Sequence, residues 1–184
     1  MAKKKKKKPD LPVPPRQPDA CVLGVDPGAK GAFAVLDPQA RLVEYHVMPT
    51  LADQASAIDP AAMYGLIRDI ATRYPGITAA LESVSSRPGQ GVVSVFTFGR
   101  GWGMIEMALI SLAIPYELVR PAKWQLTSHQ GLDREVYPDP KVRSLEAARR
   151  LWPHETFLAT KRSKVPSDGI VDAALLAWYR LKTT

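Results

Sequence analysis

Two short apolar runs joined by a glycine-containing turn are the feature that most constrains the fold of this chain. Residues 21–25 form the first run, Gly28 and Gly31 lie in the turn, and residues 32–36 form the second run. Runs of about five apolar residues bounded by glycine and proline are typical of buried strands. Because the turn is short, these strands are expected to be antiparallel, and residues 42–48 extend the pattern as a third strand.

The rest of the chain alternates helical and strand patterns. Asp59-Pro60 predicts a helix start, with apolar residues at helical spacing until Pro75-Gly76. Further elements follow in order, a strand over residues 77–81, a helix over 92–113, a strand over 114–119, and helices over 122–127, 141–151 and 167–181. Strands joined through a helix are normally parallel. The sequence therefore predicts an α/β protein with a mixed sheet flanked by helices.

The length and the charge distribution indicate one domain preceded by a basic arm. The chain has 184 residues, which favours one compact domain. Residues 1–18 contain five prolines, seven basic side chains and one acidic side chain, for a net charge of +6 out of +7 for the whole chain. We therefore expect residues 1–18 to be a flexible Lys/Pro-rich arm and residues 19–184 to be the folded domain.

Positive charge also gathers inside the domain. Residues 120–164 hold ten basic and five acidic side chains, while the remainder of the domain is acidic. This segregation favours a polyanion held against a carboxylate site, and the absence of an apolar or lipidated partner feature favours nucleic acid over a membrane surface.

Composition excludes several classes of protein. Apolar residues make up 46% of the chain and charged residues 23%, which are ordinary globular values. The longest strongly apolar stretch, residues 104–114, is about half the ~20 residues that a membrane helix needs. No apolar segment follows the basic N-terminus, so we expect a soluble cytoplasmic protein of a bacterial or phage-infected cell, with an organellar origin left open. The single cysteine, Cys21, indicates a reducing compartment.

Four carboxylates lie where chemistry is expected. Asp26 ends the first predicted strand and Glu82 ends the strand over residues 77–81, whereas Asp168 and Asp172 lie four apart on one face of the last helix. A carboxylate at the end of a buried strand is costly unless it caps, pairs or binds a cation. Each has an ordinary structural alternative, but together they would form an all-oxygen site suited to Mg²⁺ or Mn²⁺. Two such ions would support phosphodiester hydrolysis.

Other kinds of site have no support in the sequence. The three histidines show no metal-ligand spacing, and neither a Walker-type loop nor a Gly-x-Ser-x-Gly elbow is present. Gly99, Gly101 and Gly103 fall in a predicted helix, so we interpret them as positions of close helix packing.

Taken together, the motifs resemble the RuvC-type Holliday-junction resolvase family, most closely its phage and plastid branch. The resemblance covers about residues 21–181 in order, and the segments that carry it are residues 22–28 with Gly31-Ala32, Leu81-Glu82, residues 88–91 and 96–101, residues 121–124, and residues 168–176. It implies a ribonuclease H-like fold, a homodimer, and Mg²⁺-dependent nicking of two strands of a four-way junction, with Mn²⁺ expected to substitute. It also implies a catalytic metal site formed by Asp26, Glu82, Asp168 and Asp172.

The resemblance implies a set of DNA-facing residues as well. The loop over residues 85–91 would enter the junction centre, where the Gln90 amide can pair with a base edge while Gly89 and Gly91 allow close approach. Lys123 resembles a lysine near the active site of family members and would act in catalysis. The candidates for other DNA contacts are Arg87, Arg120, Lys161, Arg162 and Lys164, together with Lys141, Arg143, Arg149 and Arg150.

A second copy of the chain would explain the helix over residues 92–113. This helix is apolar nearly all round, which one small domain cannot bury, and Phe96 and Phe98 are expected to be core or dimer contacts. Two sites related by a twofold axis would match the symmetry of a four-way junction. The alternatives are a non-catalytic junction-binding module and, because the turn after Asp26 resembles a phosphate-binding loop, a sugar-kinase or actin-type ATPase.

Overall fold

The computed structural model, which describes residues 19–84 and 89–183, contains a five-stranded mixed sheet with the strand order β3-β2-β1-β4-β5. Its strands are β1 (Val22–Asp26), β2 (Ala32–Leu36), β3 (Leu42–Val47), β4 (Thr78–Glu82) and β5 (Tyr116–Val119). The first three strands are antiparallel, whereas β4 runs parallel to β1 and β5 runs parallel to β4. The predicted mixed sheet is therefore confirmed.

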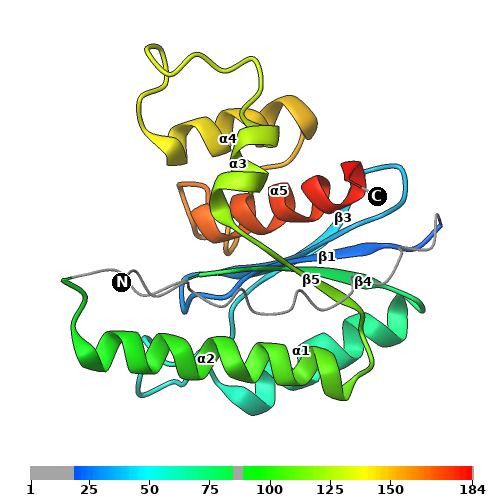
Figure 1. The fold of residues 1–184 in the computed structure, drawn as a ribbon, viewed down its shortest axis with the longest axis vertical. Coiled ribbons are helices and arrows are strands. Elements are labelled where there is room, and N and C mark those ends of the chain that lie inside the picture. Colours follow the sequence, from blue (N-terminus) through cyan, green and yellow to red (C-terminus); the bar gives the residue numbers. More distant parts are fainter. Residues whose placement is uncertain (1–18, 85–88, 184) are drawn as a thin grey trace, which may run out of the picture.

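Helices cover both faces of this sheet. Figure 1 shows α1 (Pro60–Arg73) and α2 (Val92–Ser111) on one face and α5 (Asp168–Lys182) on the other. The two remaining helices, α3 (Pro121–Ser128) and α4 (Pro140–Leu151), pack against α5 on the side away from the sheet. Within the described part of the chain, no helix is long and apolar enough to cross a membrane.

Local capping explains where the helices begin. The Asp59 carboxylate accepts hydrogen bonds from the backbone N–H groups of Ala61 and Ala62, both at 3.0 Å, and Pro60 occupies the first turn. In the same way Asp139 accepts from the Lys141 N–H at 2.8 Å at the start of α4. The structure therefore confirms both helix starts.

The predicted ends differ by one or two residues, most visibly between α2 and β5. The sequence predicts a helix to residue 113 and a strand from residue 114, but α2 ends at Ser111 and β5 begins at Tyr116. Ala113 has a φ of 53°, a left-handed conformation in which the helix cannot continue, so α2 ends two residues earlier than predicted.

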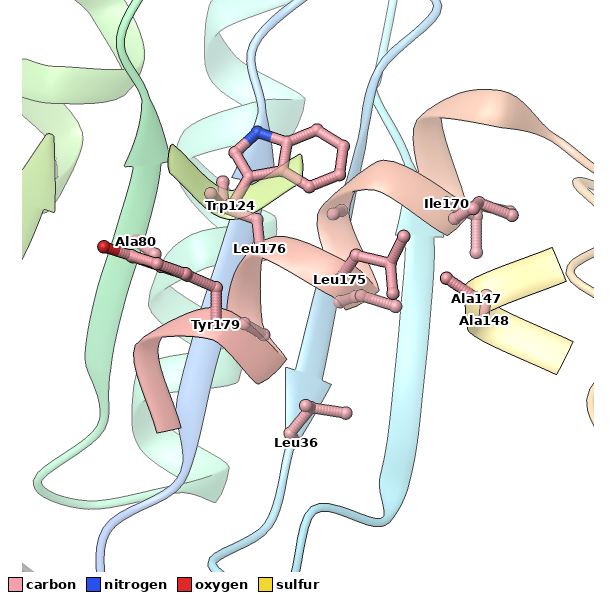
Figure 2. Close-up of a cluster of buried hydrophobic side chains, with 14 of the residues drawn as sticks. Leu36, Ala80, Trp124, Ala147, Ala148, Ile170, Leu175, Leu176 and Tyr179 are labelled. Atoms are coloured by element: carbon pink, nitrogen blue, oxygen red, sulfur yellow. The ribbon is translucent and has the colours of Figure 1, made fainter. Parts of the chain in front are cut away.

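Each face of the sheet has its own apolar core. Residues Leu23 and Val25 of β1 point to the side of α1 and α2, whereas Val22 points to the side of α5. On the α5 side, Leu175 and Leu176 pack with Trp124 of α3 and with Ala147 and Ala148 of α4, as Figure 2 shows. Strand β1 is thus buried on both faces, as expected for the central strand of a sheet that helices cover on both sides.

The exposed face of α2 corrects two sequence interpretations. A Cβ at Gly101 would lie 2.8 Å from the Ile58 side chain, as close packing predicts, but Gly99 and Gly103 face open space in this chain. Phe96 is 72% exposed, so it is not a core residue. Both errors have one cause, because this face of α2 is turned away from the sheet. The dimer alternative for Phe96 stays a prediction.

Two glycines bring α5 unusually close to β1 and to the turn that follows it. A Cβ at Gly24 would lie 1.9 Å from the backbone oxygen of Ala173, and a Cβ at Gly169 would lie 2.4 Å from the backbone oxygen of Lys30. Any side chain at these positions would push α5 away from the sheet. The close approach places the first turns of α5 beside the end of β1.

We predict that Gly24→Ala destabilises the domain by about 3 kcal/mol or more, because the methyl group would collide with backbone atoms that cannot move alone. The matched control is Gly65→Ala in α1, where a Cβ would meet nothing within 4 Å. That control should stabilise the helix by about 1 kcal/mol. Urea unfolding of both variants measures the difference, and equal midpoints would contradict the close-packing argument.

Candidate active site

Three carboxylates converge at the edge of the sheet where β1 and β4 end. Val25 pairs with Leu81 in the parallel ladder, so the last residues of the two strands, Asp26 and Glu82, lie side by side. Asp172 approaches from the second turn of α5, which Gly24 and Gly169 allow to pack closely on β1. Residues from three elements therefore meet at one point.

Burial and mutual repulsion alter the acidity of these groups. Desolvation by burial, together with the Glu82 and Asp168 charges, raises the pKa of Asp26 to about 7. Burial, together with the charges of Asp26 and Glu82, raises the pKa of Asp172 to about 8. Burial also raises the pKa of Glu82. Such repulsion between buried carboxylates is what a bound cation would remove.

Each of the three carboxylates is also held by a hydrogen bond. The Gly28 N–H lies 3.5 Å from Asp26 Oδ1, and the indole Nε1 of Trp124 donates to Glu82 Oε1 at 2.9 Å. Hydrogen bonding from the Ser144 hydroxyl of α4 partly offsets the rise in the pKa of Asp172. Neither Trp124 nor Ser144 was predicted from the sequence as a partner of a carboxylate, because a polar partner on a distant helix leaves no local pattern in the sequence.

Asp168 is arranged differently from the other three. Its side chain is 57% exposed in the first turn of α5, and its Oδ2 lies 2.7 Å from the Lys141 ammonium nitrogen. Lys141 also acts at longer range, because its positive charge opposes the rise in the pKa of Asp26. The hydrogen bond with Asp168, followed by the charges of Asp168 and Asp172, raises the pKa of the Lys141 ammonium group. The structure therefore places Lys141 at the acidic site, whereas the sequence indicated it only as a candidate phosphate contact.

The predicted metal site fits a divalent cation in its chemistry. Among residues 19–84 and 89–183, no group of three or more Asp, Glu, His or Cys side chains is arranged so that it could hold a metal ion as it stands. The donors that converge are nevertheless all carboxylate oxygens, which suit Mg²⁺ or Mn²⁺. Their raised pKa values and the ammonium group already bound to Asp168 both indicate a place that favours positive charge. The four-carboxylate ligand set stays a prediction.

The described end of the predicted DNA-facing loop, residues 89–91, reaches a cavity beside the end of β4. Gln90 and Arg120 line a cavity of about 710 Å³ whose wall includes Ser83, the residue after Glu82, and the aromatic rings of Phe98 and Trp102. Gly89 has a φ of 86°, which favours glycine, and Gly91 is the N-cap of α2. Arg87 lies outside the described residues.

The predicted basic contacts differ in accessibility. Lys161, Arg162 and Lys164 are exposed in the segment that leads into α5, and Arg120, Arg149 and Arg150 are exposed as well. Lys123 is exposed beside Trp124 in α3, and its catalytic role stays a prediction.

The interpretation of Arg143 as a phosphate contact is wrong. This residue is only 8% exposed, and its guanidinium donates to the backbone oxygens of Tyr137 and Pro138. Arg143 therefore stabilises the segment before α4 and is not available to bind DNA.

Comparisons with known proteins agree with this geometry. No protein-family model matches the chain. The crossover junction endodeoxyribonuclease RuvC of Roseiflexus sp. (strain RS-1) is 27% identical over 118 residues, which cover 61% of this chain and 69% of that protein. A structure of T. thermophilus RuvC in complex with Holliday junction substrate matches with a TM-score of 0.58 and 13% identity, covering 86% of this chain and 91% of that one. Another Thermus thermophilus RuvC structure matches with a TM-score of 0.55 and 15% identity, covering 89% and 97%.

The fold is thus ribonuclease H-like, a mixed sheet flanked by helices with carboxylates at the ends of its central parallel strands. Within that class, the sequence relative and the structural matches together confirm the resemblance to the RuvC-type family. The closer resemblance to the phage and plastid branch stays a prediction.

We predict that Asp172→Asn stabilises the metal-free protein and that its advantage grows with pH. The folded pKa of about 8 lies above the ordinary value of 3.8, so between about pH 4 and pH 8 the unfolded state binds fewer protons. The stability of the wild type therefore falls as pH rises through this window, whereas asparagine cannot ionise. Thermal unfolding in EDTA at pH 5 and pH 8.5 measures the difference between the variant and the wild type. At pH 8.5 each kcal/mol of added stability should raise the melting temperature of the variant above that of the wild type by about 2–4 °C.

The control for this measurement is Asp69→Asn, the same chemical change at an exposed position of α1. It should leave the pH dependence unchanged. A stability gain in Asp172→Asn that is the same at both pH values would contradict the assignment of a buried, repelled carboxylate.

Proposed function

We propose that this chain is a structure-specific endodeoxyribonuclease that resolves four-way DNA junctions by paired, divalent-metal-dependent phosphodiester hydrolysis. One observation carries the proposal. Asp26, Glu82 and Asp172 converge at the carboxyl edge of a sheet whose fold is that of RuvC, a protein solved in complex with a Holliday junction substrate. A non-catalytic junction-binding protein would have no need to bury three mutually repelling carboxylates.

The residues divide the chemistry among them. Asp26, Glu82, Asp172 and Asp168 would hold Mg²⁺, which Mn²⁺ could replace, and the bound ion would supply an activated water and stabilise the leaving oxygen. Glu82 and Asp172 are fixed by donors from α3 and α4, so the orientation of their carboxylates is set before the metal binds. Lys141 brings a positive charge to the same edge, where it can contact the scissile phosphate. Lys123 stays a second candidate for that role.

The DNA would reach this edge along a basic path. Lys161, Arg162 and Lys164 precede α5, and Arg120 lines the same cavity as Gln90. Backbone phosphates attract such exposed cations irrespective of sequence. The basic arm over residues 1–18 would add affinity of the same kind, and the division into arm and domain at residue 19 stays a proposal.

A homodimer would present two such sites to one junction. The outer face of α2 exposes Val92, Val93, Phe96, Met107 and Ile110. An apolar face of this kind fits a twofold interface between identical helices. We therefore propose that α2 pairs with its copy in the partner subunit. A cytoplasmic location stays a prediction.

The test is cleavage of a synthetic four-way junction in Mg²⁺, compared with linear duplex and with an RNA/DNA hybrid of the same sequence. We expect paired nicks in the junction and little cutting of the other two substrates. Binding without cutting would favour the non-catalytic module. Preferential cutting of the hybrid would indicate a general ribonuclease H activity.

We predict that Asp26→Asn abolishes cleavage but retains junction binding, because it removes one ligand charge and leaves the exposed cations in place. Glu82→Gln and Asp172→Asn should behave alike, whereas Asp168→Asn should keep partial activity, since Asp168 is exposed and paired with Lys141. Gel-shift titrations in Ca²⁺ or EDTA measure binding, and single-turnover cleavage in Mg²⁺ measures catalysis. Wild-type nicking rates in Asp26→Asn would overturn the site.

We predict that Gln90→Ala changes where the junction is cut more than how tightly it is bound. A bidentate base contact is worth about 1–3 kcal/mol of discrimination, whereas phosphate contacts dominate total affinity. The measurement is a cleavage-site map on junctions with permuted core sequences, run beside binding titrations. An unchanged cleavage-site map with unchanged cleavage rates would show that Gln90 is an ordinary turn residue.

A further inference from the structure

Two tryptophans hold Glu82 from two directions, but only one of them contacts its carboxylate. Trp124 in α3 is 1% exposed, and its indole Nε1 donates to Glu82 Oε1 at 2.9 Å. Trp102 in α2 donates instead to the backbone oxygen of Glu82 at 3.0 Å. The second bond fixes the end of β4, whereas the first fixes the rotation of the carboxylate.

Ser144 of α4 lies beside Asp172. Its Oγ is 3.2 Å from His129 Nε2. Hydrogen bonding from the same hydroxyl stabilises the ionised form of Asp172 and so opposes the rise in its pKa. Ser144 therefore links the Asp172 carboxylate to the ring of His129.

The two bonds belong to one continuous set of contacts. The rings of Trp124 and His129 meet edge to face with their centroids 6.3 Å apart. The contacts therefore run from Glu82 through Trp124, His129 and Ser144 to Asp172, with three of the five residues on α3 and α4 or between them.

We propose that Trp124 and Ser144 are positioning residues that orient the Glu82 and Asp172 carboxylates for a divalent cation, with His129 fixing Ser144. The inference rests on the proposed function, since it assigns these carboxylates to a metal. A donor that occupies one oxygen of a ligand carboxylate fixes its rotamer, and loss of such a partner typically weakens metal affinity by about 10–100-fold. A merely structural role would cost stability and leave metal affinity unchanged.

Trp124→Phe tests the first bond, because phenylalanine keeps an aromatic ring and removes the N–H donor. The matched control is Trp152→Phe, which removes the indole bond of another buried tryptophan, 2.8 Å long, to the backbone oxygen of Ala40 in another part of the domain. Mn²⁺ binding to the DNA-free full chain, measured by electron paramagnetic resonance of the free ion, should weaken about tenfold or more in Trp124→Phe. It should stay within about twofold of wild type in Trp152→Phe, although both variants lose thermal stability.

Ser144→Ala and Ser144→Thr test the second bond and keep the proposal testable if Trp124→Phe does not fold. The alanine variant should weaken Mn²⁺ binding, and threonine, which keeps the hydroxyl, should restore most of it. The Mg²⁺ concentration that gives half-maximal junction cleavage should rise in parallel, while junction affinity in EDTA stays unchanged.

The outcomes separate the two proposals. Wild-type Mn²⁺ affinity in both Trp124→Phe and Ser144→Ala overturns the positioning role. A wild-type protein that binds Mn²⁺ but does not cut four-way junctions overturns the proposed function alone. A wild-type protein that binds no Mn²⁺ overturns the metal site and both proposals with it.

Discussion

The close approach of α5 to β1 is the contact on which the rest of the structure depends. Because Gly24 and Gly169 have no side chains, α5 lies directly on the central strand and on the turn after it. This contact seals the core on one face of the sheet and carries Asp172 to the place where β1 and β4 end. The same packing that stabilises the domain therefore builds a site whose buried carboxylates repel one another.

Much of the fold could be predicted because its determinants are local. Apolar runs bounded by glycine and proline located the strands, and Asp-Pro pairs at 59–60 and 139–140 located two helix starts through caps that the structure contains. The ends of elements were less predictable. The left-handed conformation at Ala113 is imposed by the connection between α2 and β5, and an alanine gives no sign of it in the sequence. The exposed face of α2 could not be predicted either, because a helix that is apolar nearly all round has no polar face to mark the side turned to solvent.

In the candidate site, too, residues with a local sequence pattern could be predicted and residues brought in from distant elements could not. Asp26 and Glu82 could be found because each follows a strand, and parallel strands bring their ends together. The partners of these carboxylates could not be found, since Trp124 lies 42 positions from Glu82 along the chain. Lys141 and Arg143 show the limit most clearly. They are two residues apart on α4, yet one reaches the acidic site and the other turns inward to backbone oxygens.

The layer of α3 and α4 resolves a conflict between stability and chemistry. Carboxylates that repel one another tend to rotate apart in the absence of a cation, and a metal would then have to reorder them at a cost in affinity. Glu82 and Asp172 lie on different elements, so packing of the sheet alone does not set their relative orientation. Bonds from Trp124 and Ser144 tie both carboxylates to one unit that is itself packed on α5. The two glycines therefore bring the carboxylates close together, and the outer helices α3 and α4 set the orientation of those carboxylates.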